Sequence, residues 1–595
     1  MSDTAVSRPT GPTTLQRWFP IGVWLPKYNW GSFTVPDLIA AISVAALLIP
    51  ESMGYASVAN VPPQIGLYAA PLALIGYALF GGSRLLCFAA AGSVAAISAS
   101  VVASLHQAPS MNVTLVSALA LATGVVFLVG GLVRMGWITN FMSKAVMAGF
   151  ITGMAIQIIV GQLGSIFGVK ESSGNTFQKF WSVFSHISSW NWTATVVGLL
   201  AIVLIFGIQR YMKAVPAALT AVILGSIYVA IASPSIDLVK KIPKGLPSIK
   251  VPTGLSGSTW ATLLLGACVV ALVGFSEGWG AVGTIAKKTH DDVSPNQEFR
   301  AFGIGSLGAG ILGGMPVTGS LSKSSAAMTA GAKSQMANIF LAIIVLLTLL
   351  VLSPLFQWLP EAVLAAVVIN AMWGSANPAK VTKLLKADRV DFALGVITGL
   401  LVLGFGLLPA MITGIVFSVI YMVYRVSFPS RAELGRDAKT GDYEALKWVG
   451  AGKKGDGNPN AQPVPDVMLY RFDSPLIFAN SDAFKGGGEQ LMIDTGQKGP
   501  LPKTMVIDCE EIFYTDASGC AAIRDLRDYA HRYDVDIALA RLHSEARKTL
   551  TDDGVLAELG EDKVYDNVHD AVAARTVPAV GGNGAKSEEV GRTSK

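Results

Sequence analysis

The chain has 595 residues, of which 52% are hydrophobic and only 14% are charged, whereas soluble globular chains contain about 25% charged residues. Acidic residues are unevenly distributed, with 11 Asp and Glu in residues 31–428 and 28 in residues 429–595. This distribution excludes a purely soluble chain and predicts a membrane domain followed by a soluble domain. The net charge of +5 points to no partner by itself, and we expect none among nucleic acids. The four cysteines show no metal-ligand spacing, so we expect neither a metal site nor a cofactor.

The first thirty residues show no signal-peptide pattern, and we expect them to form a cytoplasmic segment. A membrane-spanning helix needs about 20 mostly apolar residues. Residues 31–428 contain fourteen apolar segments, and two of these are too short to cross a membrane alone. The first seven are 33–57, 64–81, 93–105, 113–133, 141–167, 192–211 and 214–233. The second seven are 257–285, 297–312, 320–332, 335–354, 357–374, 389–406 and 408–427. The stretch 172–190 is expected to lie at the membrane interface.

The charge of the loops predicts the orientation of these segments. If both termini are cytoplasmic, the inner loops carry fourteen Lys and Arg and the outer loops carry six, in agreement with the positive-inside rule. An even number of spans also returns the hydrophilic C-terminal region to the cytoplasm. We therefore expect a multi-pass protein of a bacterial-type inner membrane with both ends in the cytoplasm.

The segments divide into two sets of seven, in which similar features recur at corresponding places. A lone acid marks the first segment, Glu51 in LLIPESMGYA, and another marks the eighth, Glu277 in LVGFSEGWGAVG. Two segments after each acid comes a short Gly/Ser-rich helix start, first AAAGSVAAIS and then GMPVTGSLSKSSAA. Seven segments per half, an odd number, make the repeat inverted. Paired short segments of this kind indicate a binding site at the midplane of a secondary transporter.

The two short helices predict an anion site. A helix that begins in mid-membrane directs free N–H groups and the positive end of its dipole into a cavity. The expected substrate-binding residues are those of the two helix starts: Ser93, Val94, Ala95, Gly319, Ser320, Leu321, Ser322 and Lys323. The alternative is that these Gly/Ser stretches only form helix-packing faces.

Three charged residues within the apolar segments are candidates for ion coupling and binding. Glu51 and Glu277 lie well inside apolar segments, where insertion of an acid into the bilayer centre costs about 2.5–3.5 kcal/mol of free energy. Acids at such positions usually carry protons or ions. We expect both to couple proton movement, Glu277 above all, because the small residues beside it would let substrate approach. Lys323 lies in a first helical turn, where the dipole disfavours a cation, so we expect it to attract an anion. The alternatives are structural acids bonded to neighbouring helices and a lysine that extends to the membrane interface.

The pattern changes to short strands alternating with helices at about residue 464, after a predicted linker at 429–463. We expect strands at VMLYRF, LIFAN, TMVIDC and DIALARL, with helices that begin at SDAF, ASGC and SEAR. This alternation predicts a small α/β domain over residues 464–575. The tail 576–595 has a composition typical of disorder.

Together these motifs resemble the SulP family of anion permeases over nearly the whole chain. The likeness is carried by IPESMGYASVANVPPQIGLYAA, FSEGWGA, GGMPVTGSLSKSSAAMTAGAKSQMANI and VPDVMLYRFDSPLIFANSDAF. It implies an all-α membrane domain of fourteen segments in a 7+7 inverted repeat, a fold shared with nucleobase permeases, and a cytoplasmic α/β domain of the STAS type. It also implies a homodimer, an elevator-like cycle, and an anion site between the third and tenth helices.

The resemblance also assigns roles to single residues. Glu51 and Glu277 fall on acids linked to proton coupling in the family, and Ser93 and Ser322 fall at the two helix starts. Lys323 falls where prestin-like members often carry an Arg. Ser518 in DASG matches a position that is phosphorylated in related proteins, and a simple helix cap is the alternative for it.

The expected function is proton-coupled sulfate uptake by a secondary active transporter that is not an enzyme. Sodium-driven bicarbonate uptake and proton-coupled dicarboxylate uptake remain open, with Na⁺ as the alternative coupling ion. A different class is an anion channel or a voltage-driven motor, over which the two buried acids favour a proton-coupled carrier.

Overall fold

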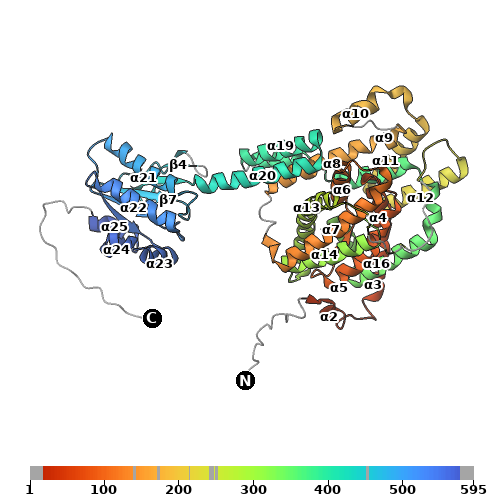
Figure 1. Ribbon diagram of the computed structural model, residues 1–595, viewed down its shortest axis with the longest axis horizontal. Helices are drawn as coiled ribbons and strands as arrows, with labels where there is room; N and C mark the ends of the chain where they lie inside the picture. Colours follow the sequence, from red (N-terminus) through yellow and green to blue (C-terminus); the bar gives the residue numbers. More distant parts are fainter. Residues whose placement is uncertain are drawn as a thin grey trace, which may run out of the picture. The chain divides into compact units, whose positions relative to one another are not determined.

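The computed structural model describes residues 18–137, 143–169, 174–212, 215–239, 247, 249, 252–386, 388–450 and 455–575. The predicted tail at 576–595 and most of the predicted N-terminal segment therefore lie outside the described residues. The chain divides into two compact units, Met1–Ser418 and Val419–Lys595, which Figure 1 shows as a helical unit and an α/β unit. The division falls within the last long helix, ten residues before the predicted end of the membrane domain.

The first unit is built of helices at the predicted apolar segments, several of them broken into two pieces. The first half contains α2 (Ile21–Trp24), α3 (Thr34–Val58), α4 (Gln64–Tyr68), α5 (Ala70–Phe80), α6 (Gly92–Ser104), α7 (Asn112–Leu132), α8 (Lys144–Gly161), α9 (Leu163–Phe167), α10 (Thr176–Ser185), α11 (Trp192–Tyr211) and α12 (Ala217–Ala232). The second half contains α13 (Gly257–Thr289), α14 (Pro295–Ile311), α15 (Leu321–Thr329), α16 (Met336–Leu347), α17 (Glu361–Trp373), α18 (Ala379–Thr382), α19 (Arg389–Phe405) and α20 (Leu407–Ser427).

Among the described helices, six are long and apolar enough to cross a membrane by length and composition. These six spans are Thr34–Val58, Pro109–Leu132, Lys144–Phe167, Trp192–Tyr211, Gly257–Thr289 and Leu407–Ser427. The shorter apolar helices include α6, in agreement with the prediction that the segment 93–105 is too short to cross alone. The unit is thus a mostly helical membrane domain.

Two short strands, which the sequence analysis did not predict, lie inside this helical unit. β1 (Cys87–Ala89) and β2 (Thr318–Ser320) pair antiparallel, with Phe88 opposite Gly319. Non-helical backbone inside a membrane domain needs hydrogen-bond partners for its N–H and C=O groups, and the pairing of β1 with β2 supplies them. Each strand leads into a short helix, β1 into α6 and β2 into α15. The ladder therefore holds the two predicted helix starts side by side.

Helix contacts in the two halves form matching sets. α13 packs against α6 and α7, while α3 packs against α15 and α16. Likewise α14 packs against α7 and α5 against α16, and α19 packs against α8 and α11 against α17. In each of these pairs, the two contacts join corresponding helices: where one contact uses a helix of the first half, the other uses its counterpart in the second half, and the reverse.

The second unit is a mixed sheet covered by helices on both faces. Its strands are β3 (Arg431–Asp437), β4 (Tyr443–Val449), β5 (Gly455–Asp456), β6 (Ala461–Gln462), β7 (Val467–Phe472), β8 (Thr504–Asp508), β9 (Asp536–Ala540) and β10 (Val564–Tyr565). They lie in the order β10-β9-β8-β7-β3-β4-β5, with β6 beside β3; β7 to β10 are parallel and β3 to β5 antiparallel. The helices are α21 (Ser481–Gly496), α22 (Ala517–His531), α23 (Ser544–Asp552), α24 (Val555–Leu559) and α25 (Val568–Arg575).

Alternation along β7 divides the core of this unit between the two faces of the sheet. Met468, Tyr470 and Phe472 pack with α21 to α24, whereas Val467 and Leu469 pack with α25. Successive side chains of a strand point to opposite faces, so a fully apolar strand such as VMLYRF is buried on both.

Two predictions for this unit are wrong. The predicted strand LIFAN contributes only an isolated bridge between Leu476 and Thr515, followed by a turn. Residues 429–463, predicted as a linker, instead contain β3 to β6, and β3 pairs directly with β7. The strands of this region have one face exposed to solvent and bury few residues, chiefly Ala432, Leu434 and Ala445. The polar, Gly-rich composition that results is typical of a linker, so the sequence pattern does not predict these strands.

Candidate functional site

Lys323 forms a buried ion pair with Glu51. Lys323 lies in the first turn of α15 with 1% of its surface exposed, and its Nζ is 2.6 Å from Oε2 of Glu51 on α3. The same ammonium lies 5.3 Å from the centre of the Tyr55 ring, one turn further along α3. The alternative of a lysine that extends to the membrane interface is therefore wrong. In this conformation Glu51 neutralises the ammonium, and the attraction of an anion by Lys323 stays a prediction.

Glu277 is held at the start of the other short helix. Ser93, in the first turn of α6, donates from Oγ to Oε2 of Glu277 on α13 at 2.5 Å. Ala91 precedes this helix in an extended conformation and provides no side-chain cap, so no cap within the described part of the chain occupies the first N–H groups of α6. A helix N-terminus of this kind attracts negative charge.

The two buried acids belong to one cluster. Lys323 Nζ also donates to the carbonyl of Ala90, directly before α6, at 3.4 Å. An added Cβ at Gly92 would lie 3.3 Å from Cε1 of Tyr55 and 2.6 Å from Cε of Met372 on α17. The ring of Tyr55 thus lies near both the ammonium of Lys323 and the start of α6, so α3, α6 and α15 meet at one place.

α13 approaches β2 closely, and its glycines make this possible. Thr318 donates from Oγ1 to the carbonyl of Gly274 at 2.5 Å. An added Cβ at Gly319 would lie 2.9 Å from Cα of Gly278. Gly278, directly after Glu277, therefore serves backbone packing against β2, and the approach of substrate beside Glu277 stays a prediction.

The remaining predicted binding residues divide into buried and exposed groups. Ser320 caps α15 by accepting from the backbone N–H of Lys323 at 3.4 Å, and its hydroxyl lies 3.2 Å from that of Ser322. Leu321 and Ser322 are exposed. The buried members of the predicted set are Ser93, Val94, Ala95, Gly319, Ser320 and Lys323. The structure thus brings together both helix starts, both acids and the lysine.

The sequence analysis missed several groups of the cluster. Tyr55 follows Glu51 by one helical turn, so a helical reading of IPESMGYA would have placed both on one face. Ser324 accepts from the N–H of Cys87 at 2.8 Å and donates to the carbonyl of Ser320 at 2.6 Å, which joins α15 to β1. Nothing in the local sequence signals this contact or that of the Ala90 carbonyl.

Comparison with known proteins decides the family. The sulfate permease family profile matches residues 35–398, and the STAS domain profile matches residues 458–571. The chain belongs to the sulfate permease family. The predicted family membership is thereby confirmed, as are the predictions of a transmembrane transporter type and of a STAS domain.

Relatives within this family carry sulfate transporter names. Sulfate transporter 4.1, chloroplastic, of Arabidopsis thaliana is 28% identical over 93% of this chain and 82% of its own length. "Probable sulfate transporter Rv1739c" of Mycobacterium tuberculosis is 28% identical over 90% of this chain and 94% of its own length.

Solved structures show the same fold. The murine Slc26a9 anion transporter in its inward-facing state covers 96% of both chains, with a TM-score of 0.83 and 22% identity. The transmembrane domain of the cyanobacterial bicarbonate transporter BicA covers 65% of this chain and 96% of its own, with a TM-score of 0.56 and 19% identity. At such identities the likeness shows the fold alone.

In the STAS domain, Asp516 rather than Ser518 caps α22, accepting from the N–H of Gly519 at 3.0 Å. The alternative that Ser518 is the cap of this helix is therefore wrong. The regulatory role of Ser518 stays a prediction. Among the described residues, no group of three His, Cys, Asp or Glu is arranged to hold a metal ion.

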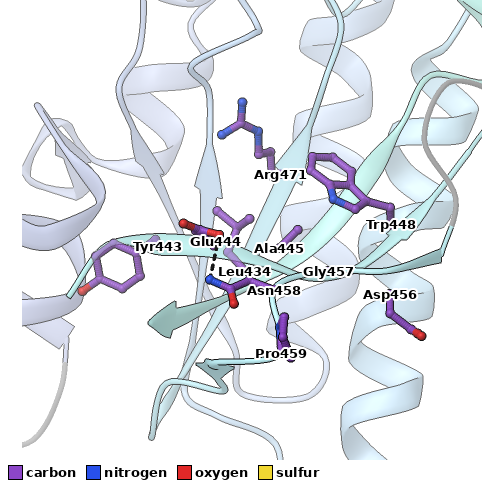
Figure 2. Close-up of a pocket in the computed structure, with 10 residues that line it drawn as sticks. All are labelled: Leu434, Tyr443, Glu444, Ala445, Trp448, Asp456, Gly457, Asn458, Pro459 and Arg471. Carbon is purple, nitrogen blue, oxygen red and sulfur yellow. Dashed lines mark hydrogen bonds between the residues drawn. The ribbon is translucent and has the colours of Figure 1, made fainter. Parts of the chain in front are cut away.

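Figure 2 shows a surface hollow of about 590 Å³ in the STAS domain, beside the β4–β5 hairpin. Among its described lining residues, the one cation, Arg471, and the amide, Asn458, are engaged with neighbouring carboxylates. Asn458 donates to Glu444 at 2.8 Å, and Arg471 binds Asp473 at 2.7 Å and Glu510 at 3.1 Å. The hollow therefore presents no cation to an anionic ligand, unlike the cluster in the membrane domain.

Proposed function

We propose that the protein takes up sulfate together with protons. The observation that carries the proposal is the buried pair of Lys323 and Glu51 at the start of α15, opposite the start of α6. A helix start and a lysine favour a bound oxyanion, whereas an ionised Glu51 competes with that anion for the lysine. The sulfate transporter names of the relatives support the substrate.

The pair provides a physical route to coupling. When Glu51 takes up a proton, its charge disappears and the ammonium of Lys323 becomes available to an anion. The anion then binds more tightly to the protonated protein, and by linkage the proton binds more tightly when the anion is present. Proton and anion therefore move in the same direction.

Glu277 acts on the other helix start in the same way. While Glu277 is ionised, the hydroxyl of Ser93 donates to it. Once Glu277 is protonated, this hydroxyl is free to donate to an oxyanion at the N-terminus of α6. Both acids thus block a donor when ionised and release it when protonated, which makes each a candidate proton carrier.

The matching helix contacts of the two halves support a 7+7 inverted repeat. Such repeats allow alternating access, and we propose an elevator-like cycle in which the elements that carry the site move against the rest. The homodimer, the cytoplasmic position of both termini and of the STAS domain, and the inner-membrane location belong to the same proposal. The charge distribution of the loops supports this orientation.

Bicarbonate is the second candidate substrate, since the membrane domain shares the fold of BicA. An uptake panel in proteoliposomes separates the candidates: sulfate, bicarbonate and fumarate are offered with an inward proton gradient, with an inward sodium gradient, and with neither. We expect sulfate accumulation that depends on the proton gradient. Sodium-driven bicarbonate accumulation without sulfate uptake would contradict the proposal.

A further inference from the structure

A separate cavity of about 330 Å³ lies in the membrane domain and includes no residue of the anion cluster. Three segments line it: residues of the N-terminal turn between Pro20 and Phe33, the connection Gly81 to Arg84 after α5, and the turn Lys333 to Gln335 before α16. The cavity therefore joins the first described residues of the chain to both halves of the membrane domain.

The N-terminal wall of this cavity is fixed in place. Trp24 of α2 donates from its indole nitrogen to the carbonyl of Ala78 on α5 at 3.1 Å. The ring centres of Phe19 and Phe80 lie 5.4 Å apart, and Tyr28 is buried against Phe33 with ring centres 5.9 Å apart. Aromatic residues such as Trp24 and Tyr28 favour the membrane–water interface.

Three cations line the cavity, and two of them are uncommitted. Arg84 pairs with Asp291 and donates to the carbonyl of Thr289. Lys27 and Lys333 are exposed, and neither ammonium has a carboxylate partner among the described residues. Two exposed lysines that line one cavity give it a positive potential, which favours an anionic ligand.

The carboxylates behind the lining are already bound by other donors. Asp37 accepts from the backbone N–H groups of Lys333 at 2.6 Å and Ser334 at 3.2 Å, and from the Ser334 hydroxyl at 2.7 Å. Glu298 accepts from the Tyr77 hydroxyl and from the N–H of Gly82, each at 2.8 Å. These acids hold the cavity walls together and leave the two ammonium groups to a ligand.

A buried hydroxyl in the same wall has no partner. Ser83 is 1% exposed and lines the cavity, and its Oγ makes no hydrogen bond within the described chain. Its carbonyl is bound by the Gln335 amide at 2.7 Å, which fixes the backbone there. Buried polar groups are normally hydrogen-bonded, so the Ser83 hydroxyl is open to a hydrogen bond from a ligand in the cavity.

An exposed apolar stripe begins beside the cavity. Val35, Leu38, Ile39 and Ile42 on α3 are 61%, 41%, 52% and 56% exposed. Their spacing places them on one face of the helix. The stripe starts two residues after Phe33, which itself lines the cavity. A cationic cavity next to an apolar strip matches the headgroup and acyl chains of a phospholipid, whereas free phosphate would use the cavity alone.

We propose that this cavity binds the phosphate of an anionic phospholipid, with Lys27 and Lys333 as its charged donors, the Ser83 hydroxyl beside it, and the acyl chains along α3. The lipid bridges the N-terminal turn, the end of α5 and the start of α16. In the proposed orientation the cavity faces the cytoplasmic leaflet, where anionic lipids attract cationic groups.

Thermal unfolding of the purified full-length protein in detergent tests this site. The protein is titrated separately with phosphatidylglycerol, phosphatidylcholine and inorganic phosphate. The test variant is K27Q/K333Q. The matched control is K287Q/K288Q, which removes two exposed lysines at the end of α13 and changes the net charge equally. Ser83→Ala removes the unpaired hydroxyl.

We expect phosphatidylglycerol alone to raise the unfolding midpoint of the wild type and of the control. In K27Q/K333Q the half-effective lipid concentration should rise about tenfold. Ser83→Ala should also require more lipid; if the hydroxyl were merely buried, the variant would shift the midpoint equally with and without lipid. Equal titrations of K27Q/K333Q and the control would overturn the site, and so would equal responses to the two lipids.

Inorganic phosphate that reproduces the full effect of phosphatidylglycerol would replace the lipid by a soluble anion and so overturn the lipid assignment. The assay involves no transport, so its outcome is independent of the sulfate proposal.

Discussion

Lys323 and Glu51 lie 272 positions apart in the sequence, yet their charged atoms are 2.6 Å apart. A buried pair of this kind is costly to break, because removal of one partner leaves a buried charge without compensation. Nothing else in the described membrane domain places a buried lysine at a helix start. At the scale of single residues, function therefore depends on how this pair responds to protons and anions.

Lys323→Ala should weaken sulfate binding by at least tenfold, because it removes a charge-assisted donor. It should also destabilise the protein by about 3–5 kcal/mol, because Glu51 is left unpaired. The double variant Glu51→Gln/Lys323→Met removes both charges, so it should recover most of the stability but not the affinity. Equilibrium binding of labelled sulfate and thermal unfolding are measured on both. Wild-type affinity in a folded Lys323→Ala protein would place the anion elsewhere.

Glu51→Gln should mimic the protonated acid permanently. We expect sulfate binding to survive and exchange of labelled for unlabelled sulfate to persist, whereas an inward proton gradient should no longer drive accumulation. Glu277→Gln leaves the Ser93 hydroxyl without an ionised acceptor and should show the same pattern if this acid carries the proton. Gradient-driven uptake and exchange are compared in both variants. If both accumulate sulfate as the wild type does, coupling through these acids is wrong.

At the scale of elements, α8 and α19 cross through facing glycines. An added Cβ at Gly149 would lie 1.9 Å from the carbonyl oxygen of Gly395, and one at Gly153 would lie 2.7 Å from that of Gly399. Each helix carries its two glycines four residues apart, the small-residue spacing that lets membrane helices approach closely. The backbones of these helices leave no room for a methyl group.

Gly149→Ala should therefore separate α8 from α19 and cost about 1–3 kcal/mol, the usual cost of overpacking. Gly161→Ala is the matched control, since no atom lies within 4 Å of its added Cβ at the end of the same helix. Thermal unfolding of the two variants in detergent should show a lower midpoint for the first only. Equal midpoints would show that the crossing relaxes without cost.

At the scale of the whole molecule, the two units have separate cores. The groups of the anion cluster come from α3, α6, α13 and α15 with β1 and β2, all within residues 1–418. The sheet of the second unit begins at Arg431 with β3. A shortened chain must therefore end before β3, because otherwise this strand would lose its partners β4 and β7.

A chain that ends at Phe428, after α20, should keep sulfate binding within about threefold of the full-length protein, since no group of the cluster is removed. Size-exclusion chromatography establishes that the shortened protein is folded, and binding of labelled sulfate measures the site. Loss of all binding in well-folded shortened protein would show that the STAS domain helps to form the site.

Local sequence patterns were enough to predict the apolar helices and the correspondence between the two short helix starts. Hydropathy is a local property, so helix bounds such as Thr34–Val58 and Gly92–Ser104 lie within a few residues of the predicted ones. The same locality explains why Glu51, Glu277 and Lys323 were recognised: an ionisable residue within an apolar run is conspicuous without knowledge of its neighbours.

Which of these groups meet depends on contacts between segments that are distant in the sequence. The β1–β2 ladder, the Lys323–Glu51 pair and the Gly278–Gly319 approach join residues far apart in the chain. Three-residue strands carry too little periodicity to be recognised, and a partner across the fold leaves no local trace. The strands at 431–449 were missed for a related reason, because their pairing with β7 outweighs a polar composition typical of a linker.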